Sequence, residues 1–268
     1  MRPQVLCLLP LMAFAQTASL RGPAITGPVL GYVWDGAGGG IRALNGVPGA
    51  ASLDPALSLP MSLDAAWSAR GVALAVPKGQ ANPVVVTWTG LEPTAGPLGT
   101  DLACDLGAIS FGGRFASVYE QSAKAVEVWT KLASGPKRTL RLAADGLGAI
   151  AISDTGELAA ARGAALLILS SEGESDLVKL DHPVTALAWS GDGRLAAAFS
   201  GGVTIVSPAG GPSLSLTYDG DADRLETLNG PAVFRLADDS AGQSWILDAS
   251  GAKPRILPLP AASGRTGK

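Results

Sequence analysis

Three aspartates at every second position are the residues of this chain whose spacing best suits a chemical role. Asp219, Asp221 and Asp223 alternate with Gly220 and Ala222. Carboxylate oxygens from the first, third and fifth positions of a loop can converge on a hard cation such as calcium. These three residues are therefore the candidate metal site, and calcium is the one cofactor that the sequence offers.

The residues after this loop depart from the pattern of calcium loops. Arg224 occupies the sixth place, where such loops need glycine, and it brings a positive charge towards the ion. Thr227 and Gly230 stand at the ninth and twelfth places, where calcium loops of one type or another supply an acid. Only Glu226 is nearby as a further ligand. The alternative is a solvated turn, and we expect that calcium is not held here.

Other groups that could support catalysis are scarce. His182 is the only histidine, so a histidine-rich zinc site cannot form. A catalytic histidine also needs a partner, and the G-x-S-x-G motif of one large class of serine hydrolases is missing. Cys104 lies in an alternating stretch beside Asp105 and favours a small core residue over a reactive thiol, because neighbouring acids raise a thiol pKa.

Two further patterns have structural explanations. The glycine run at 36–40 lacks the Lys-Ser/Thr pair of a phosphate-binding loop and favours a hairpin turn. The six tryptophans could form a sugar-binding platform. Most of them recur with the repeat described next, which favours packing in the core.

These residues must be positioned by a repeated unit. A phrase of two apolar residues followed by Asp, Ser or Thr returns six times, and its polar residues are Asp35, Thr89, Thr130, Ser170, Ser207 and Asp248. Their successive spacings are 54, 41, 40, 37 and 41 residues. A period of about 40 residues made of strand-like segments is typical of propeller blades with four strands each.

A second phrase runs in step with the first and ends in a tight turn. Its fullest copy ends in Ser190-Gly191-Asp192-Gly193 and is followed by an alanine-rich segment. Glycine and aspartate suit a hairpin turn, and small side chains suit inner strands that crowd around a central axis.

The two phrases predict an all-β fold, a propeller of six blades of which the first is incomplete; five blades is the alternative. Complete blades are expected at 59–105, 107–142, 147–180, 184–217 and 224–259, within a single domain at 16–260. The excess segment 45–59 is predicted to be an inserted loop, and 261–268 a disordered tail.

The segment 181–196 carries a family resemblance. It has a histidine before an apolar strand that ends in Trp189-Ser190, then an Asp-Gly turn and Arg194-Leu195-Ala196. With Trp34-Asp35, this resembles the blades of WD-repeat proteins, and the chain is similar to the degenerate propellers that many bacteria export. The resemblance implies a non-catalytic scaffold that binds partners on its faces.

The N-terminus predicts export. Arg2 precedes an apolar run at 5–14, and Ala13-Phe14-Ala15 is a cleavage signal before Gln16. Segment 1–15 is therefore interpreted as a signal peptide, with a buried strand as the alternative. No segment is long and apolar enough for a transmembrane helix. The exported chain would carry 19 basic and 23 acidic residues without a basic block, which disfavours a nucleic-acid partner.

We therefore expect a periplasmic or secreted scaffold that binds a protein or a glycan and has no catalysis of its own. A hydrolase or lyase acting on an extracellular polymer and a purely structural assembly module are the alternatives. An enzyme would need acids, or an acid with His or Tyr, converging in the central channel. The alanine-rich inner strands favour the scaffold.

Overall fold

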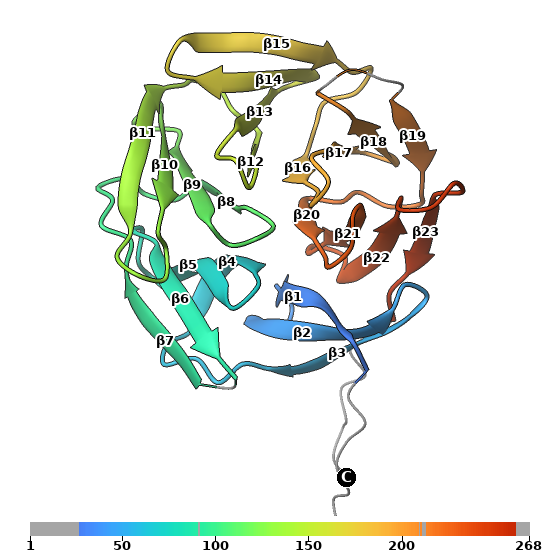
Figure 1. Cartoon of the computed structure of the whole chain (residues 1–268), viewed down its shortest axis with the longest axis horizontal. Helices are drawn as coiled ribbons and strands as arrows, with labels where there is room; N and C mark the ends of the chain where they lie inside the picture. Colours follow the sequence, from blue (N-terminus) through green and yellow to red (C-terminus); the bar gives the residue numbers. More distant parts are fainter. Residues whose placement is uncertain (1–26, 91, 209, 211–212, 261–268) are drawn as a thin grey trace, which may run out of the picture.

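The computed structural model describes residues 27–90, 92–208, 210 and 213–260, and every helix or strand in that part is a β-strand. Twenty-three strands form six antiparallel sheets, which stand as blades around a central axis (Figure 1). Five sheets have four strands and one has three. The chain is thus a six-bladed propeller with an incomplete first blade, as predicted. The predicted signal peptide and tail lie outside the described residues.

The strands follow the blades in chain order. Blade 1 consists of β1 (Val29–Asp35), β2 (Gly40–Val47) and β3 (Ala50–Ala56). Blade 2 consists of β4 (Leu63–Ala69), β5 (Val72–Pro77), β6 (Val84–Thr89) and β7 (Glu92–Pro97). Blade 3 consists of β8 (Leu106–Ile109), β9 (Phe115–Glu120), β10 (Ala125–Thr130) and β11 (Lys137–Ala143). Blade 4 consists of β12 (Ala149–Ile152), β13 (Leu158–Arg162), β14 (Ala165–Ser170) and β15 (Gly173–Lys179). Blade 5 consists of β16 (Ala186–Trp189), β17 (Leu195–Phe199), β18 (Gly202–Val206) and β19 (Leu214–Thr217). Blade 6 consists of β20 (Arg224–Thr227), β21 (Val233–Asp238), β22 (Gln243–Asp248) and β23 (Arg255–Pro258).

The two sequence phrases correspond to fixed places in blades 2 to 6. The polar residue of the first phrase ends or directly follows the third strand, as Thr130 ends β10 and Ser207 follows β18. In blades 2 to 5 the second phrase and the small residues after it form the first two strands, and most of their alanines are buried; Ala196, Ala197 and Ala198 are 0% exposed. Small side chains therefore stand where neighbouring blades approach most closely.

The apolar cores lie between neighbouring blades. Trp189, for example, packs with Leu187 and Leu195 of blade 5 and with Leu166 of blade 4. Trp34, Trp88 and Trp129 are buried in the same manner, which confirms the predicted inter-blade role of these tryptophans.

Blade 1 differs from the prediction in its register. Asp35 ends β1, but Gly36 lies against Asp239 in the turn between the second and third strands of blade 6. β1 therefore corresponds to a second strand, β2 to a third and β3 to a fourth, and the innermost strand is the missing one. The loop predicted at 45–59 is wrong, because most of this segment belongs to β2 and β3, which pair with each other.

Candidate functional site

The axis of the ring holds a channel with a volume of about 270 Å³. Its wall is formed by the inner strands β4, β8, β12, β16 and β20. Small residues make up much of the wall, as expected, and they include Ala65, Ala108, Ala149, Ala151, Ala186 and Ala188. Polar side chains stand among these small residues, and three of them are carboxylates.

Three carboxylates line the channel, and each one has a partner within the blades. Asp105 accepts a hydrogen bond from the backbone N–H of Gln121 at 2.8 Å. Asp223 accepts one from the backbone N–H of Asp239 at 3.3 Å. Glu226 is buried and forms an ion pair with Arg235 at 2.6 Å. Each of the three acids is thus engaged either by a backbone N–H group or by an arginine of the neighbouring strand.

Asp223 is a channel carboxylate with a raised pKa. Burial is the largest cause and raises the pKa, and the negative charges of Asp239 and Asp238 raise it further. The hydrogen bond from Asp239 and the positive charge of Arg224 offset part of this shift.

Trp67 packs between blades 2 and 3 and also borders the channel. It is half-buried and lines the channel, where its ring packs so closely on β8 that a Cβ at Gly107 would lie 2.5 Å from it. The guanidinium of Arg224 lies 5.6 Å from the ring centroid and donates to the carbonyl of Ala66 at 2.8 Å.

The predicted metal residues do not come together. Asp221 accepts a hydrogen bond from Ser200 at 2.5 Å, Asp223 bonds to the turn at Asp239, and Asp219 is exposed. Among the described residues, no three His, Cys, Asp or Glu side chains form a group that could hold a metal ion. Calcium binding at this loop stays a prediction, which is tested below.

The two other candidate groups lie apart from one another. His182 is exposed, and its ring stacks on Phe199 with centroids 5.1 Å apart. Cys104 packs against the core between blades 2 and 3, and burial, followed by the charge of Asp105, raises the pKa of its thiol to about 12. A thiol with so high a pKa is protonated at neutral pH and unreactive, as the sequence indicated.

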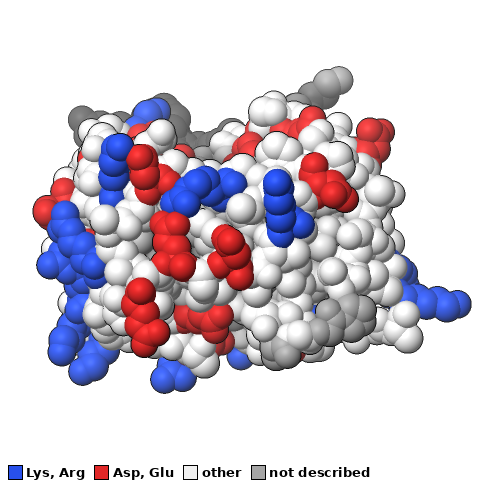
Figure 2. All heavy atoms as spheres, turned by 90° about the horizontal axis from the view of Figure 1, so that it is seen from above, with Lys and Arg blue, Asp and Glu red and all other residues white. Residues whose placement is uncertain are grey.

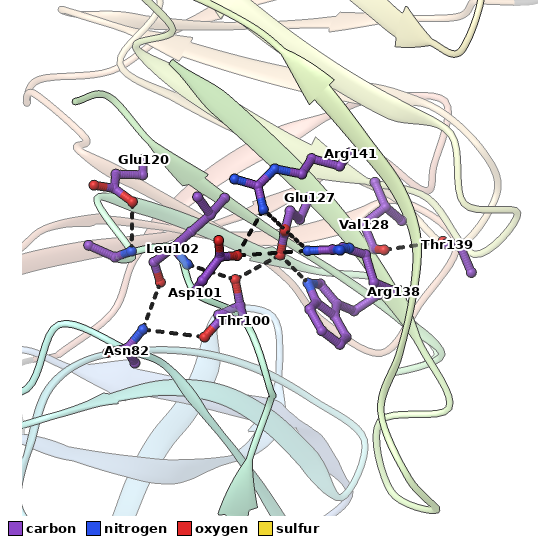
Figure 3. Close-up of polar contacts among 12 residues, drawn as sticks. Asn82, Thr100, Asp101, Leu102, Glu120, Glu127, Val128, Arg138, Thr139 and Arg141 are labelled. Carbon is purple, nitrogen blue, oxygen red and sulfur yellow. Dashed lines mark hydrogen bonds and ion pairs between the residues drawn. The ribbon is translucent and has the colours of Figure 1, made fainter. Parts of the chain in front are cut away.

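A buried carboxylate that the sequence analysis did not single out lies in the third blade (Figure 3). Glu127 on β10 is 0% exposed, and its Oε2 accepts hydrogen bonds from Thr100 at 2.7 Å and from the Trp129 indole at 3.1 Å. Its Oε1 accepts from Arg141 at 3.0 Å and from Arg138. Four donors satisfy both oxygens, so this cluster ties the 98–105 connection to the outer strands and leaves no free acceptor site. The signal for it was a single acid within the apolar strand 125–129.

A buried ion pair between Glu226 and Arg235 takes the place of the missing strand of blade 1. Along the inner edge of β1, the backbone N–H of Trp34 donates to Glu226 at 2.8 Å, and its carbonyl accepts from Arg235 at 2.8 Å. The carbonyl of Tyr32 on the same edge accepts from the Ser68 hydroxyl at 2.8 Å. We call Glu226 and Arg235 the clasp, because these two side chains join blade 6 to an edge that would otherwise lack partners.

The comparisons with known proteins support the fold and go no further. No family model matches the sequence, and no curated protein matches it. A chain of the nidogen/laminin complex is 13% identical, with 87% of this chain and 93% of that chain covered and a TM-score of 0.62. Virginiamycin B lyase from Staphylococcus aureus is 13% identical, covering 87% and 85% of the two chains with a TM-score of 0.52. A streptogramin B lyase is 12% identical, covering 88% and 84%, also with a TM-score of 0.52. These neighbours have varied roles, so the likeness defines the class of fold, the six-bladed propeller.

Proposed function

We propose that this protein is an exported propeller that binds a protein or glycan partner and catalyses no reaction of its own. The observation that carries the proposal is the state of the channel carboxylates. Asp105, Asp223 and Glu226 each bond to the backbone or to an arginine of the blades. Polymer hydrolysis needs a pair of acids that converge on one bond, with one of them free to donate a proton.

The position of the histidine also supports a scaffold over a lyase. One solved structure is of a catalytically inactive virginiamycin B lyase in which a histidine is replaced by alanine. In this chain His182 is absent from the lining of the channel and stacks on Phe199 at the protein surface. This position supports a scaffold over a lyase that would depend on a histidine in the channel.

The distribution of charge favours a protein or glycan partner over nucleic acid. Seen towards its edge, the molecule shows acidic and basic side chains side by side (Figure 2). The outer strand β11 carries Lys137, Arg138 and Arg141, whereas β15 carries Glu174 and Asp176. Nucleic acid binding would use a continuous basic surface. The described residues also include no helix long and apolar enough to cross a membrane.

The test combines a binding assay with an assay for products. The exported chain is incubated with polysaccharides and with proteins from the exported fraction, and thermal shift and mass spectrometry are read together. We expect a partner to raise the melting temperature without product formation, equally in the Asp105→Asn and Asp223→Asn variants. Product formation that disappears in Asp223→Asn would contradict the proposal and establish the enzyme. Concentration-dependent self-association without any partner would favour the assembly module.

A further inference from the structure

The missing strand of blade 1 leaves a space between β20 and β4 that is filled at one end only. The clasp and Arg224 occupy the end near Trp34. At the other end is a groove with a volume of about 330 Å³, at the lower end of the range for ligand pockets. It is lined by the start of β1 and by the turns of blades 2, 3 and 6.

The groove has an aromatic wall. Tyr32 and Trp88 meet edge to face with centroids 4.9 Å apart, and Phe111 closes the side towards the channel, since it lines both cavities. Val29 at the rim is 41% exposed and is one of only two large apolar side chains exposed in the described part of the chain. The surface of the groove is thus suited to an apolar group.

One charged side chain, Arg70, stands in this groove. Its guanidinium lies 4.7 Å from the centroid of Phe111, and its Nε donates to Asn229 at 2.8 Å, so two contacts fix its orientation. In the described part of the chain, Arg70 and Arg114 are the arginines that form no ion pair with an acid. An oriented guanidinium without an acid partner favours a carboxylate ligand.

Two other polar side chains of the groove already have partners, whereas the buried indole N–H of Trp88 has none among the described residues. The Thr227 hydroxyl donates to the carbonyl of Trp189 at 2.6 Å. The amide of Asn229 donates to the carbonyl of Val29 at 2.9 Å and accepts from Arg70. A sugar ring needs hydrogen bonds to several groups, and Thr227 and Asn229 are already engaged. An apolar side chain beside one carboxylate needs only the aromatic wall and Arg70.

We propose that this groove binds the C-terminal residue of a partner protein, with its apolar side chain among Tyr32, Trp88 and Phe111 and its carboxylate on Arg70. Capture of a terminal carboxylate is a known mode of peptide recognition. This inference rests on the proposed scaffold function and narrows the partner to a protein.

The test compares peptides that differ only at the terminal group. Acetylated tetrapeptides ending in Phe, Leu, Val or Asp are titrated into the exported chain as free acids and as C-terminal amides, by calorimetry. We expect a free acid with an apolar last residue to bind at least about tenfold more tightly than its amide, because a charge-assisted hydrogen bond is lost. This comparison uses the unaltered protein and does not depend on a variant that folds.

Two variants then assign the carboxylate site. Arg70→Gln should weaken binding of the free acid about tenfold or more and leave the affinity for the amide unchanged. Arg114→Gln removes the same charge from an exposed arginine in the corresponding turn of blade 3, and it should change the affinity for neither peptide form.

The inference would be overturned by any of three results: the acid and the amide bind equally, the affinity for the acid does not respond to Arg70→Gln, or no peptide binds. Displacement of a bound peptide by a galacturonate oligomer that binds more tightly would make a glycan the occupant. If the peptides fail while a partner still raises the melting temperature, only this inference falls and the scaffold stands.

Discussion

At the scale of single residues, tryptophans from first, second and third strands alike are buried between blades, and Trp67 differs because it is half-buried beside the channel. Trp88 and Trp129 are on third strands and are buried between blades, at 7% and 5% exposure. Trp67 is on a first strand and faces the channel beside Arg224. Composition and spacing could predict the first group, because its members follow the repeat, but the direction of Trp67 depends on the contact that Gly107 allows.

Replacing a tryptophan between blades should strongly destabilise the fold. We expect Trp129→Ala to lower the free energy of unfolding by about 3–5 kcal/mol, as for other buried large-to-small changes. Urea unfolding measures this change. Val47→Ala is the control, since Val47 is 52% exposed and its replacement should change stability by about 0.5 kcal/mol or less. A Trp129→Ala protein that keeps its stability but loses partner binding would favour a binding platform over the core.

Calcium should have no effect on stability through the acidic loop. The side chains of Asp221 and Asp223 bond to different partners, Ser200 and the backbone of Asp239, so they do not converge. We expect no shift of the melting temperature up to about millimolar calcium, the weak end for extracellular calcium sites. A rise below that level that is abolished by Asp221→Asn would instead establish a calcium site.

The raised pKa of Asp223 predicts a pH-dependent effect of its removal. Because the folded-state pKa lies above the ordinary value of 3.8, protonation favours the folded form, and this contribution is lost as pH rises through the folded pKa. Asp223→Asn keeps an acceptor for Asp239 and removes the charge. Thermal unfolding should therefore show a stabilised variant at neutral pH and a smaller difference below pH 3.8. A variant less stable than the natural protein at neutral pH would contradict this.

At the scale of elements, the sequence could predict five blades almost to their ends, because each carries the first phrase and four of them also carry the second. Blade 1 could not be placed in the same manner, since Trp34-Asp35 has the form of a third-strand phrase but ends a second strand. β3 contains Asp54-Pro55 and resembles a loop, yet these residues fall where the register with β2 shifts, and an outermost strand tolerates proline there. Glu226 and Arg235 of the clasp bond to Trp34, which lies 192 and 201 positions earlier in the chain, so no local sequence pattern could predict these contacts.

Breaking the clasp should open the ring where blade 6 meets blade 1. We expect Arg235→Met to destabilise the protein by about 3–5 kcal/mol, because it leaves the Glu226 carboxylate buried without its charge partner. Arg162→Met is the matched control, since the Arg162–Glu174 pair at 2.9 Å is exposed and worth about 1 kcal/mol at most. Hydrogen exchange should rise first in β1 and β20. Equal losses in the two variants, or faster exchange elsewhere, would mean that the clasp does not close the ring.

At the scale of the whole molecule, side chains and an apolar core close the ring between its first and last blades. Leu30, Val33 and Leu44 of blade 1 pack with Val233 and Ile246 of blade 6. β23 lies beside blade 1, so the described chain begins and ends on the two sides of this junction (Figure 1). The junction therefore unites three features in one place: the missing strand, the clasp and the groove. A partner that fills the groove would contact both blades and should stabilise the closed ring by mass action.

Export is the prediction that concerns the whole chain. The basic Arg2, the apolar run and Ala13-Phe14-Ala15 predict cleavage before Gln16. Such a cleavage removes no residue of the 23 strands, since β1 begins at Val29, so the propeller can fold after export. Mass spectrometry of the protein from its natural source should find Gln16, free or cyclised, as the first residue in the periplasmic or secreted fraction. Intact Met1 on cytoplasmic material would contradict export, and the search for a partner would then move to the cytoplasm.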